Sequence, residues 1–326
     1  MSSRETARID LDPLGGVAGD MFAAALADAF PEHLPRVERD LASAGVPQGV
    51  RAHIEESRNA GFRGARFVVE QDTESTPPRT LTAMQRFLGE GALGQPVCRH
   101  ALAIFTHLAE AEARVHGASV DSVHFHEVSD WDSVVDVVAA ASLIHSVDSP
   151  HWRVGPLPLG GGTVRTAHGD IPVPAPATAE ILKGFEWIDD GAAGERVTPT
   201  GASILKHLCG NRDPGAGAGT LARIGIGCGT RTLDGRANLL RAMVFAGAGG
   251  DEQREFVELL SFEVDDMSGE ELAVAMQHLR ATTGVLDAVQ IPMLGKKGRS
   301  TTGVRLMLTD MRLRAAKMSA QVIAWS

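Results

Sequence analysis

The sequence contains no tyrosine and only three cysteines, and each shortage excludes a kind of chemistry. Without tyrosine, no phenolic hydroxyl can act as an acid or base. The cysteines, Cys98, Cys209 and Cys228, are widely spaced and form no Cys-x-x-Cys pair, which argues against a disulfide framework and against a zinc ribbon. We interpret them as buried apolar thiols, although Cys228 lies among glycines where a ligand could reach it.

Basic residues and long apolar runs are also scarce. The net charge of −10 over 326 residues argues against general nucleic-acid binding, which requires a basic surface. No apolar run reaches the length of a membrane helix, and the N-terminus lacks the apolar core of a signal peptide. We therefore expect a cytoplasmic protein with no nucleic-acid and no membrane partner. A hydrophobic content of 44% predicts a globular protein. At 326 residues, the chain is longer than one ordinary domain.

The most informative segment is residues 124–136, HFHEVSDWDSVVD, which combines two histidines with a glutamate and three aspartates. The alternation of histidine with apolar residues predicts a strand on which His124 and His126 share one face, with Glu127 at its end. Asp132 is predicted to open a helix, where acidic residues suit the free amide groups. Imidazole and carboxylate groups at this density indicate metal binding or acid–base chemistry. A solvated strand end and a helix cap are the alternative.

A second segment, residues 155–178, is rich in glycine and proline and reads GPLPLGGGTVRTAHGDIPVPAPAT. Gly160, Gly161 and Gly162 allow a ligand to approach the backbone, and Arg165 and His168 follow them. Alternate prolines stiffen the chain and exclude a regular central strand. We predict a ligand-facing loop, with a rigid hairpin leading into a helix over 177–182 as the alternative.

The N-terminal segment combines aspartates with a glycine turn. Asp10 and Asp12 alternate on an apolar strand, and a turn containing Asp20 leads into a helix over 21–30. A strand, a glycine turn and a helix N-terminus can cradle an anion, and an aspartate there can hold a divalent ion beside a phosphate. An ordinary strand–turn–helix is the alternative.

Charged residues of both signs gather near the C-terminus. Asp265 and Asp266 end a strand, and Lys296, Lys297 and Arg299 lie in a later turn. An acidic pair and a basic trio at one end of a small sheet suit a metal–nucleotide ligand. A solvated turn beside a helix N-terminus is the alternative.

These segments together resemble a known family. GGVAGDM, AEARVHG, HFHEV with DSVVDVV, the glycine–proline block, VTPTGASIL, VDDM and GKKGR occur in the order found in the LarC family of nickel-insertion proteins. The resemblance covers residues 9–299, and residues 160–178 are its most specific part. It implies CTP-dependent insertion of nickel into a bis-thiocarboxylated pyridinium mononucleotide, which forms the nickel-pincer nucleotide cofactor of lactate racemase.

The resemblance also implies roles for individual residues. Nickel would be held by His124, His126 and Glu127, and the catalytic residues would be His126, Glu127 and His168. The precursor or a phosphate would be bound by Asp12, Asp20, Gly160, Gly161, Gly162 and Arg165. CTP with Mg²⁺ or Mn²⁺ would be bound by Asp265, Asp266, Lys296, Lys297 and Arg299. The expected partners are a small-molecule nucleotide precursor, the lactate racemase apoprotein and further copies of the chain in a homo-oligomer.

The succession of apolar patterns predicts a mixed α/β fold in two domains. Residues 1–246 are predicted to form a larger mixed-sheet domain for the metal and precursor, and residues 247–255 a linker of small and charged residues. Residues 256–326 show the βαββ opening of a ferredoxin-like nucleotide-binding module. Members of the family continue beyond this point, so we expect a truncated module.

Two functions of other classes remain open. A metal-dependent nucleotide phosphohydrolase would turn over nucleotide without any precursor. A nickel storage or delivery protein would bind metal stoichiometrically and would not respond to CTP.

Overall fold

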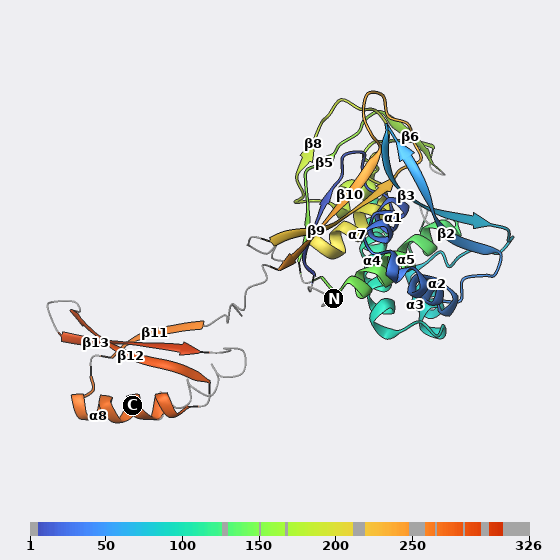
Figure 1. Ribbon diagram of the computed structural model, residues 1–326. Coiled ribbons are helices and arrows are strands. Elements are labelled where there is room, and N and C mark those ends of the chain that lie inside the picture. The colour runs from blue at the N-terminus through green and yellow to red at the C-terminus, as the bar shows by residue number, and fades with distance from the viewer. Residues whose placement is uncertain are drawn as a thin grey trace. The chain divides into compact units, whose positions relative to one another are not determined.

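The computed structural model describes residues 6–125, 130–149, 151–166, 169–210, 219–247, 258–264, 266–282, 284–294 and 300–308. The chain forms two compact units, Met1–Gly249 and Gly250–Ser326. Both units contain helices and strands, so the predicted α/β fold class is confirmed (Figure 1). Of the predicted linker, only Gly247 belongs to the described residues, and it ends a strand.

A mixed six-stranded sheet forms the centre of the first unit, in the order β2-β3-β9-β10-β1-β4. Its strands are β1 (Thr6–Asp12), β2 (Val50–Asn59), β3 (Phe62–Gln71), β4 (Trp152–Val154), β9 (Gly219–Cys228) and β10 (Leu239–Gly247). The pairs β1–β4 and β3–β9 are parallel, and the other neighbours are antiparallel. The first strand of the unit, β1, therefore pairs with its last strand, β10, so the two ends of the unit's sequence meet in the sheet.

Helices pack against this sheet and against each other. They are α1 (Gly19–Ala29), the 3-10 turn η1 (Pro31–His33), α2 (Leu34–Ser43), α3 (Leu81–Glu90), α4 (Gln95–His116), α5 (Trp131–Val147), α6 (Pro176–Ile181) and α7 (Pro199–Cys209). Thr80 caps α3, because its Oγ1 accepts a hydrogen bond from the Ala83 amide at 3.2 Å. Pro199 takes the first helical position of α7, and Thr198 caps that helix.

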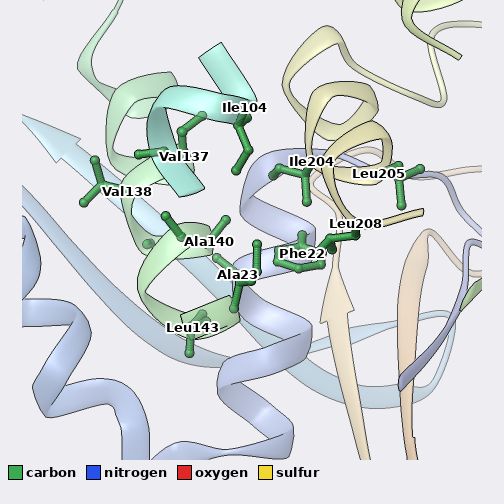
Figure 2. Close-up of a cluster of buried hydrophobic side chains, with 14 of the residues drawn as sticks. Phe22, Ala23, Ile104, Val137, Val138, Ala140, Leu143, Ile204, Leu205 and Leu208 are labelled. Carbon is green, nitrogen blue, oxygen red and sulfur yellow. The ribbon is translucent and has the colours of Figure 1, made fainter. Parts of the chain in front are cut away.

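Helix α1 lies at the centre of the first unit and is buried on nearly every side. On one side it lies directly on β9, where Cβ atoms on Gly225 and Gly227 would fall 2.0 Å from α1 backbone oxygens. On the other side, Phe22 and Ala23 belong to one buried cluster with side chains of α4, α5 and α7, which include Ile104, Ala140 and Ile204 (Figure 2). This close packing on both sides fixes the position of the α1 N-terminus.

The glycine–proline block forms a hairpin, which was the alternative to the predicted ligand-facing loop. Strand β6 (Thr163–Thr166) pairs antiparallel with β7 (Gly169–Pro172), and α6 follows. Nearby, β5 (Leu157–Pro158) pairs with β8 (Trp187–Ile188). The prolines therefore direct a short, stiff excursion from the main sheet, as their restricted φ angles predict.

The strand predicted around His124 and His126 is not formed over the described residues 123–125. This segment belongs to no helix or sheet, and its Phe125 amide donates to the Arg79 carbonyl at 2.8 Å. The alternation itself is present, because Val123 and Phe125 are buried while His124 is exposed. Burial of the two apolar side chains, without strand pairing, accounts for the pattern.

The second unit contains β11 (Glu258–Val264), α8 (Gly269–Ala281), β12 (Val285–Leu294) and β13 (Ser300–Leu308). The sheet order is β11-β13-β12 and both pairs are antiparallel. A small core of Leu272, Met276, Ala288, Val304, Leu306 and Leu308 joins the helix to the sheet. Its element order is the predicted βαββ.

Candidate functional site

Three aspartates from two helix N-termini gather at one end of the helical layer of the first unit. Asp20 lies in the first turn of α1, and Asp132 and Asp136 lie one turn apart on α5. Asp20 Oδ1 accepts a hydrogen bond from the Met21 amide at 2.8 Å, and Asp132 Oδ1 accepts one from the Ser133 amide at 2.8 Å. Asp136 Oδ1 is buried and has no hydrogen-bond partner among the described residues. We call these three residues the carboxylate cluster.

The cluster is electrostatically strained. Burial raises the pKa of Asp136 well above the ordinary 3.8, and the charges of Asp20 and Asp132 raise it further. Burial also raises the pKa of Asp20, which the Met21 amide and the positive charge of Arg66 partly offset. Partial burial raises the pKa of Asp132 as well. A divalent cation or a shared proton would relieve this repulsion.

Asp20 also lines a cavity of about 360 Å³ in the first unit. Its walls come from four chain segments, which contribute Gly15, Ala18, Asp20 and Met21; Thr163 and Val164; Gly194, Glu195, Arg196 and Thr198; and Gly229, Thr230, Arg231, Leu233 and Asn238. The cavity therefore joins the N-terminal glycine turn to the hairpin that follows Gly160–Gly162. Two further segments, 194–198 and 229–238, complete it.

The buried Arg196 holds the cavity walls together. Its Nε donates to the Gly15 carbonyl at 2.6 Å, and its Nη2 donates to the Leu14 carbonyl at 3.0 Å. Its Nη1 donates to both carboxylate oxygens of Asp190 at 3.1 Å, and Asp190 also forms an ion pair with Arg236. Because its donors are engaged in this way, Arg196 acts as a scaffold for the glycine turn.

Arg231 is the wall residue best placed to present positive charge. Its Nη1 donates to the Glu195 carbonyl at 2.7 Å, and the Asn238 side chain fixes its backbone by donating to the Arg231 carbonyl at 2.9 Å. Gly194 leaves room for the guanidinium, because a Cβ there would fall 2.1 Å from Arg231 Nη2. The cavity thus presents a carboxylate from Asp20 and a guanidinium from Arg231.

Other residues proposed from the sequence lie around this cavity without lining it. Asp12 ends β1 and its Oδ2 accepts from Arg241 Nη2 at 2.5 Å. Gly161 bridges to Gly194, whose amide donates to the Gly161 carbonyl at 2.7 Å. Gly160 and Gly162 have φ angles of 71° and 83°, which suit glycine. Arg165 is exposed, 3.8 Å from Asp170.

The remaining predicted site residues fall into two groups. His126, Glu127, His168, Asp265, Lys296, Lys297 and Arg299 lie outside the described residues. His124 belongs to the described residues of the first unit and is exposed, two residues before His126. Asp266 is exposed in the second unit, where it borders a groove between α8 and the sheet together with Phe262, Glu270 and Val304.

Sequence reasoning counted Asp136 within the 124–136 segment but gave it no role, and it missed the 194–198 and 229–238 segments. Asp136 could have been found, because it is a lone charge between Val134, Val135, Val137 and Val138 on a buried helix, one turn from Asp132. The two wall segments carry no comparable local signal. Residues 229–238 reach the cavity through the long-range pairing of β9 and β10 with β1. Residues 194–198 reach it through the Val17–Val197 bridge and the hydrogen bond from Arg196 to Gly15.

Two further findings concern clusters of metal-binding side chains and membrane-spanning helices. No three histidine, cysteine, aspartate or glutamate side chains among them surround one point closely enough to hold a metal ion. Cys228 is buried, and burial raises the pKa of its thiol, which disfavours the thiolate that binds metals. Every helix in the described part of the chain is too short or too polar to span a lipid bilayer.

Comparison with known proteins identifies the family. The family model described as "Nickel insertion protein" matches residues 9–323. Relatives named "Putative nickel insertion protein" include one from Geobacter metallireducens, 39% identical over 88% of this chain and 73% of its own length. One from Syntrophotalea carbinolica is 36% identical over 96% and 78%. One from Myxococcus xanthus is 36% identical over 89% and 73%. No solved structure matches. The chain belongs to the nickel insertion protein family, the LarC family that its motifs resemble.

Proposed function

We propose that this protein inserts nickel into a bis-thiocarboxylated pyridinium mononucleotide in a CTP-dependent reaction, and so forms the nickel-pincer nucleotide cofactor of lactate racemase. Membership of the nickel insertion family supports the metal. The observation that carries the proposal is the double position of Asp20, which lines the cavity and interacts electrostatically with Asp132 and Asp136. A small molecule in the cavity would therefore lie next to carboxylates that could contribute to a divalent-ion site, with further ligands from outside the described residues.

In this proposal the carboxylate cluster and the 124–127 segment receive nickel together. His124 precedes α5 by a few residues, and His126 and Glu127 lie between them in sequence. Imidazole and carboxylate groups are suitable nickel ligands. Binding of the ion displaces the proton that burial favours on Asp136, so nickel affinity rises with pH.

The cavity would hold the precursor with its sulfur atoms toward Asp20. Thiocarboxylate sulfur is a softer ligand than carboxylate oxygen, so nickel can pass from the protein to the precursor. Formation of a nickel–carbon bond to the ring releases a ring proton, and His126, Glu127 or His168 would accept it. Arg231 would neutralise the negative charge of the mononucleotide phosphate.

CTP would bind to the second unit, with Asp265 and Asp266 holding Mg²⁺ or Mn²⁺ and Lys296, Lys297 and Arg299 on the phosphates. Asp266 is exposed just before α8, whose N-terminus is closed by a Ser268–Glu271 capping box. The proposal further includes a cytoplasmic location, a homo-oligomeric state and the lactate racemase apoprotein as the recipient of the finished cofactor.

The decisive experiment combines the purified chain with Ni²⁺, the precursor and CTP with Mg²⁺ or Mn²⁺, and follows nickel in the small-molecule product by mass spectrometry. Nickel in the product that depends on CTP supports the proposal. CTP consumption without precursor would indicate a phosphohydrolase instead. Stoichiometric nickel binding that is unaffected by CTP and precursor would indicate a storage or delivery protein.

A further inference from the structure

Outside the carboxylate cluster, four histidines from three helices lie in a row on the helical layer of the first unit. They are His100 and His107 of α4, His145 of α5 and His207 of α7. His100 Nδ1 lies 2.8 Å from His207 Nε2, and the two ring centroids are 5.1 Å apart. The ring of His145 lies 6.4 Å from that of His100, and the ring of His107 lies 6.4 Å from that of His207. We call this group the histidine row.

The helices that carry the row are rigid, while its rings are accessible. Each of the four histidines is half-buried. His100 and His107 are seven residues apart, two helical turns, so they project from the same face of α4. The neighbouring residues Ile104, Ile144 and Leu208 belong to the buried core beneath them. The backbone positions are therefore fixed by packing, and the rings can turn at the surface.

The spacing of the central pair suits a shared metal ion. Two imidazole nitrogens bound at about 2.0–2.1 Å to one ion are about 3.3 Å apart in tetrahedral coordination and about 2.9 Å apart at the right angle of square-planar or octahedral coordination. The observed separation of 2.8 Å between His100 Nδ1 and His207 Nε2 is close to the right-angle value. An ion could thus replace the proton that the two rings share once each ring turns its nitrogen lone pair away from the other nitrogen and toward the ion, with no movement of the helices.

We propose that His100 and His207 anchor a second divalent-metal site, with His107 or His145 rotating in as a third ligand, since as they stand no three of these side chains surround one point. An all-imidazole site suits nickel, copper or zinc rather than magnesium or calcium. The choice of nickel as the natural ion rests on the proposed function. His145 lies nine residues beyond Asp136 on α5, about 13 Å along the helix. The row is therefore a separate site that would keep nickel close to the carboxylate cluster.

The test measures bound nickel in the full-length, metal-free chain by equilibrium dialysis and elemental analysis. The variant His100→Ala/His207→Ala removes the anchoring pair. His53→Ala is the matched control, because His53 is an exposed histidine on β2 in the same unit. We expect the double variant to lose one nickel equivalent, or to bind it at least tenfold more weakly, while the control binds as the parent does. Equal binding by the double variant and the control would overturn the proposal.

Two additions keep the result interpretable. His207→Gln alone, checked by circular dichroism, replaces the double variant if that chain does not fold. Electron paramagnetic resonance of bound Cu²⁺ should show fewer nitrogen couplings in either variant than in the parent, and an unchanged coupling pattern would contradict the assignment. Asp20→Asn/Asp136→Asn should leave the row's nickel in place. If nickel transfer to the precursor fails while the row still binds metal, the proposed function is wrong and the row stands.

Discussion

The carboxylate of Asp136 occupies the space that a side chain at position 19 would need. A Cβ atom on Gly19 would lie 2.6 Å from Asp136 Oδ2 and 2.7 Å from Asp136 Cβ. Gly19 is therefore required because a carboxylate from α5 packs against the first residue of α1. This contact places Asp136 directly beside Asp20. It also explains why a glycine precedes Asp20 in the N-terminal GGVAGDM segment.

The first prediction tests this fit. Gly19→Ala should destabilise the fold by about 1–3 kcal/mol, because the new methyl group collides with a carboxylate that has little room to move. Thermal and denaturant unfolding would measure the change. In the background of Asp136→Gly, which removes both the carboxylate and the Cβ atom, most of the penalty should disappear, which is a coupling between neighbours. Gly89→Ala is the control, since an added Cβ on that exposed glycine of α3 meets nothing within 4 Å. Equal penalties for Gly19→Ala in both backgrounds would refute the contact.

The second prediction concerns the charge of Asp136. The folded chain has a raised pKa at this carboxyl, so it retains a proton that the unfolded chain loses above its ordinary 3.8. This contribution to stability is complete below that value and is lost as the pH rises through the folded pKa. Asp136→Asn should therefore raise the stability of the metal-free protein at pH 7, on the order of 1 kcal/mol. Melting curves from pH 4 to 8 would show a weaker pH dependence in the variant.

Nickel should stabilise the parent protein more than it stabilises Asp136→Asn. Bound metal stabilises the folded chain by mass action, and the neutral amide of Asp136→Asn is a poorer ligand than a carboxylate. The parent should gain more in melting temperature on addition of Ni²⁺ than the variant does. An identical gain in both would remove Asp136 from the nickel site.

The third prediction concerns Arg196. Arg196→Ala leaves Asp190 without one of its two arginines and leaves the Gly15 and Leu14 carbonyls without their donor. We expect a loss of about 3–5 kcal/mol in the free energy of unfolding, the cost of breaking a buried ion pair. Arg196→Lys keeps the charge but not the forked geometry, so it should recover only part of this loss. Full recovery with lysine would show that charge alone matters.

The fourth prediction concerns the 124–127 segment. His126→Ala should lower nickel affinity, because a metal site loses a strong donor with each imidazole. Stability should fall only slightly if the side chain faces a surface site. Calorimetry would measure the affinity, with His53→Ala as a control on a distant strand. Unchanged nickel binding combined with lost folding would assign His126 a structural role.

The fifth prediction concerns the second unit. CTP with Mn²⁺ should raise the melting temperature, and Asp266→Ala or Lys297→Ala should remove the shift. Asp287→Asn is the matched control, because Asp287 is an exposed carboxylate on β12 of the same unit. Equal shifts with ATP would leave phosphate binding intact but would rule out a preference for cytosine.

The sequence predicted most of the elements but only part of the site. Helix α1 followed from local patterns, because apolar periodicity acts over a few residues. The strand at His124 was wrong, since burial of Val123 and Phe125 creates the same alternation without a pairing partner. Asp136 was given no role although its lone charge in an apolar helix was visible, and its contact with Gly19, more than a hundred residues earlier, leaves no local signal.

The cavity walls could not have been predicted for the same reason. Residues 194–198 meet Gly15 through Arg196, and residues 229–238 follow β9 back toward the sheet. Neither segment has a pattern that names a ligand. Only long-range contacts bring them beside Asp20.

Burial of α1 has a consequence for engineering the selectivity of this protein. A helix packed between a sheet and three other helices cannot be enlarged, shifted or trimmed without loss of the fold, so the carboxylate of Asp20 is a fixed reference point. The opposing walls, at Thr163–Val164 and Thr230–Leu233, lie in a hairpin and a connecting segment that tolerate change more readily. Altering the size of molecule that reaches Asp20 therefore means redesigning these walls and leaving the helix as it is.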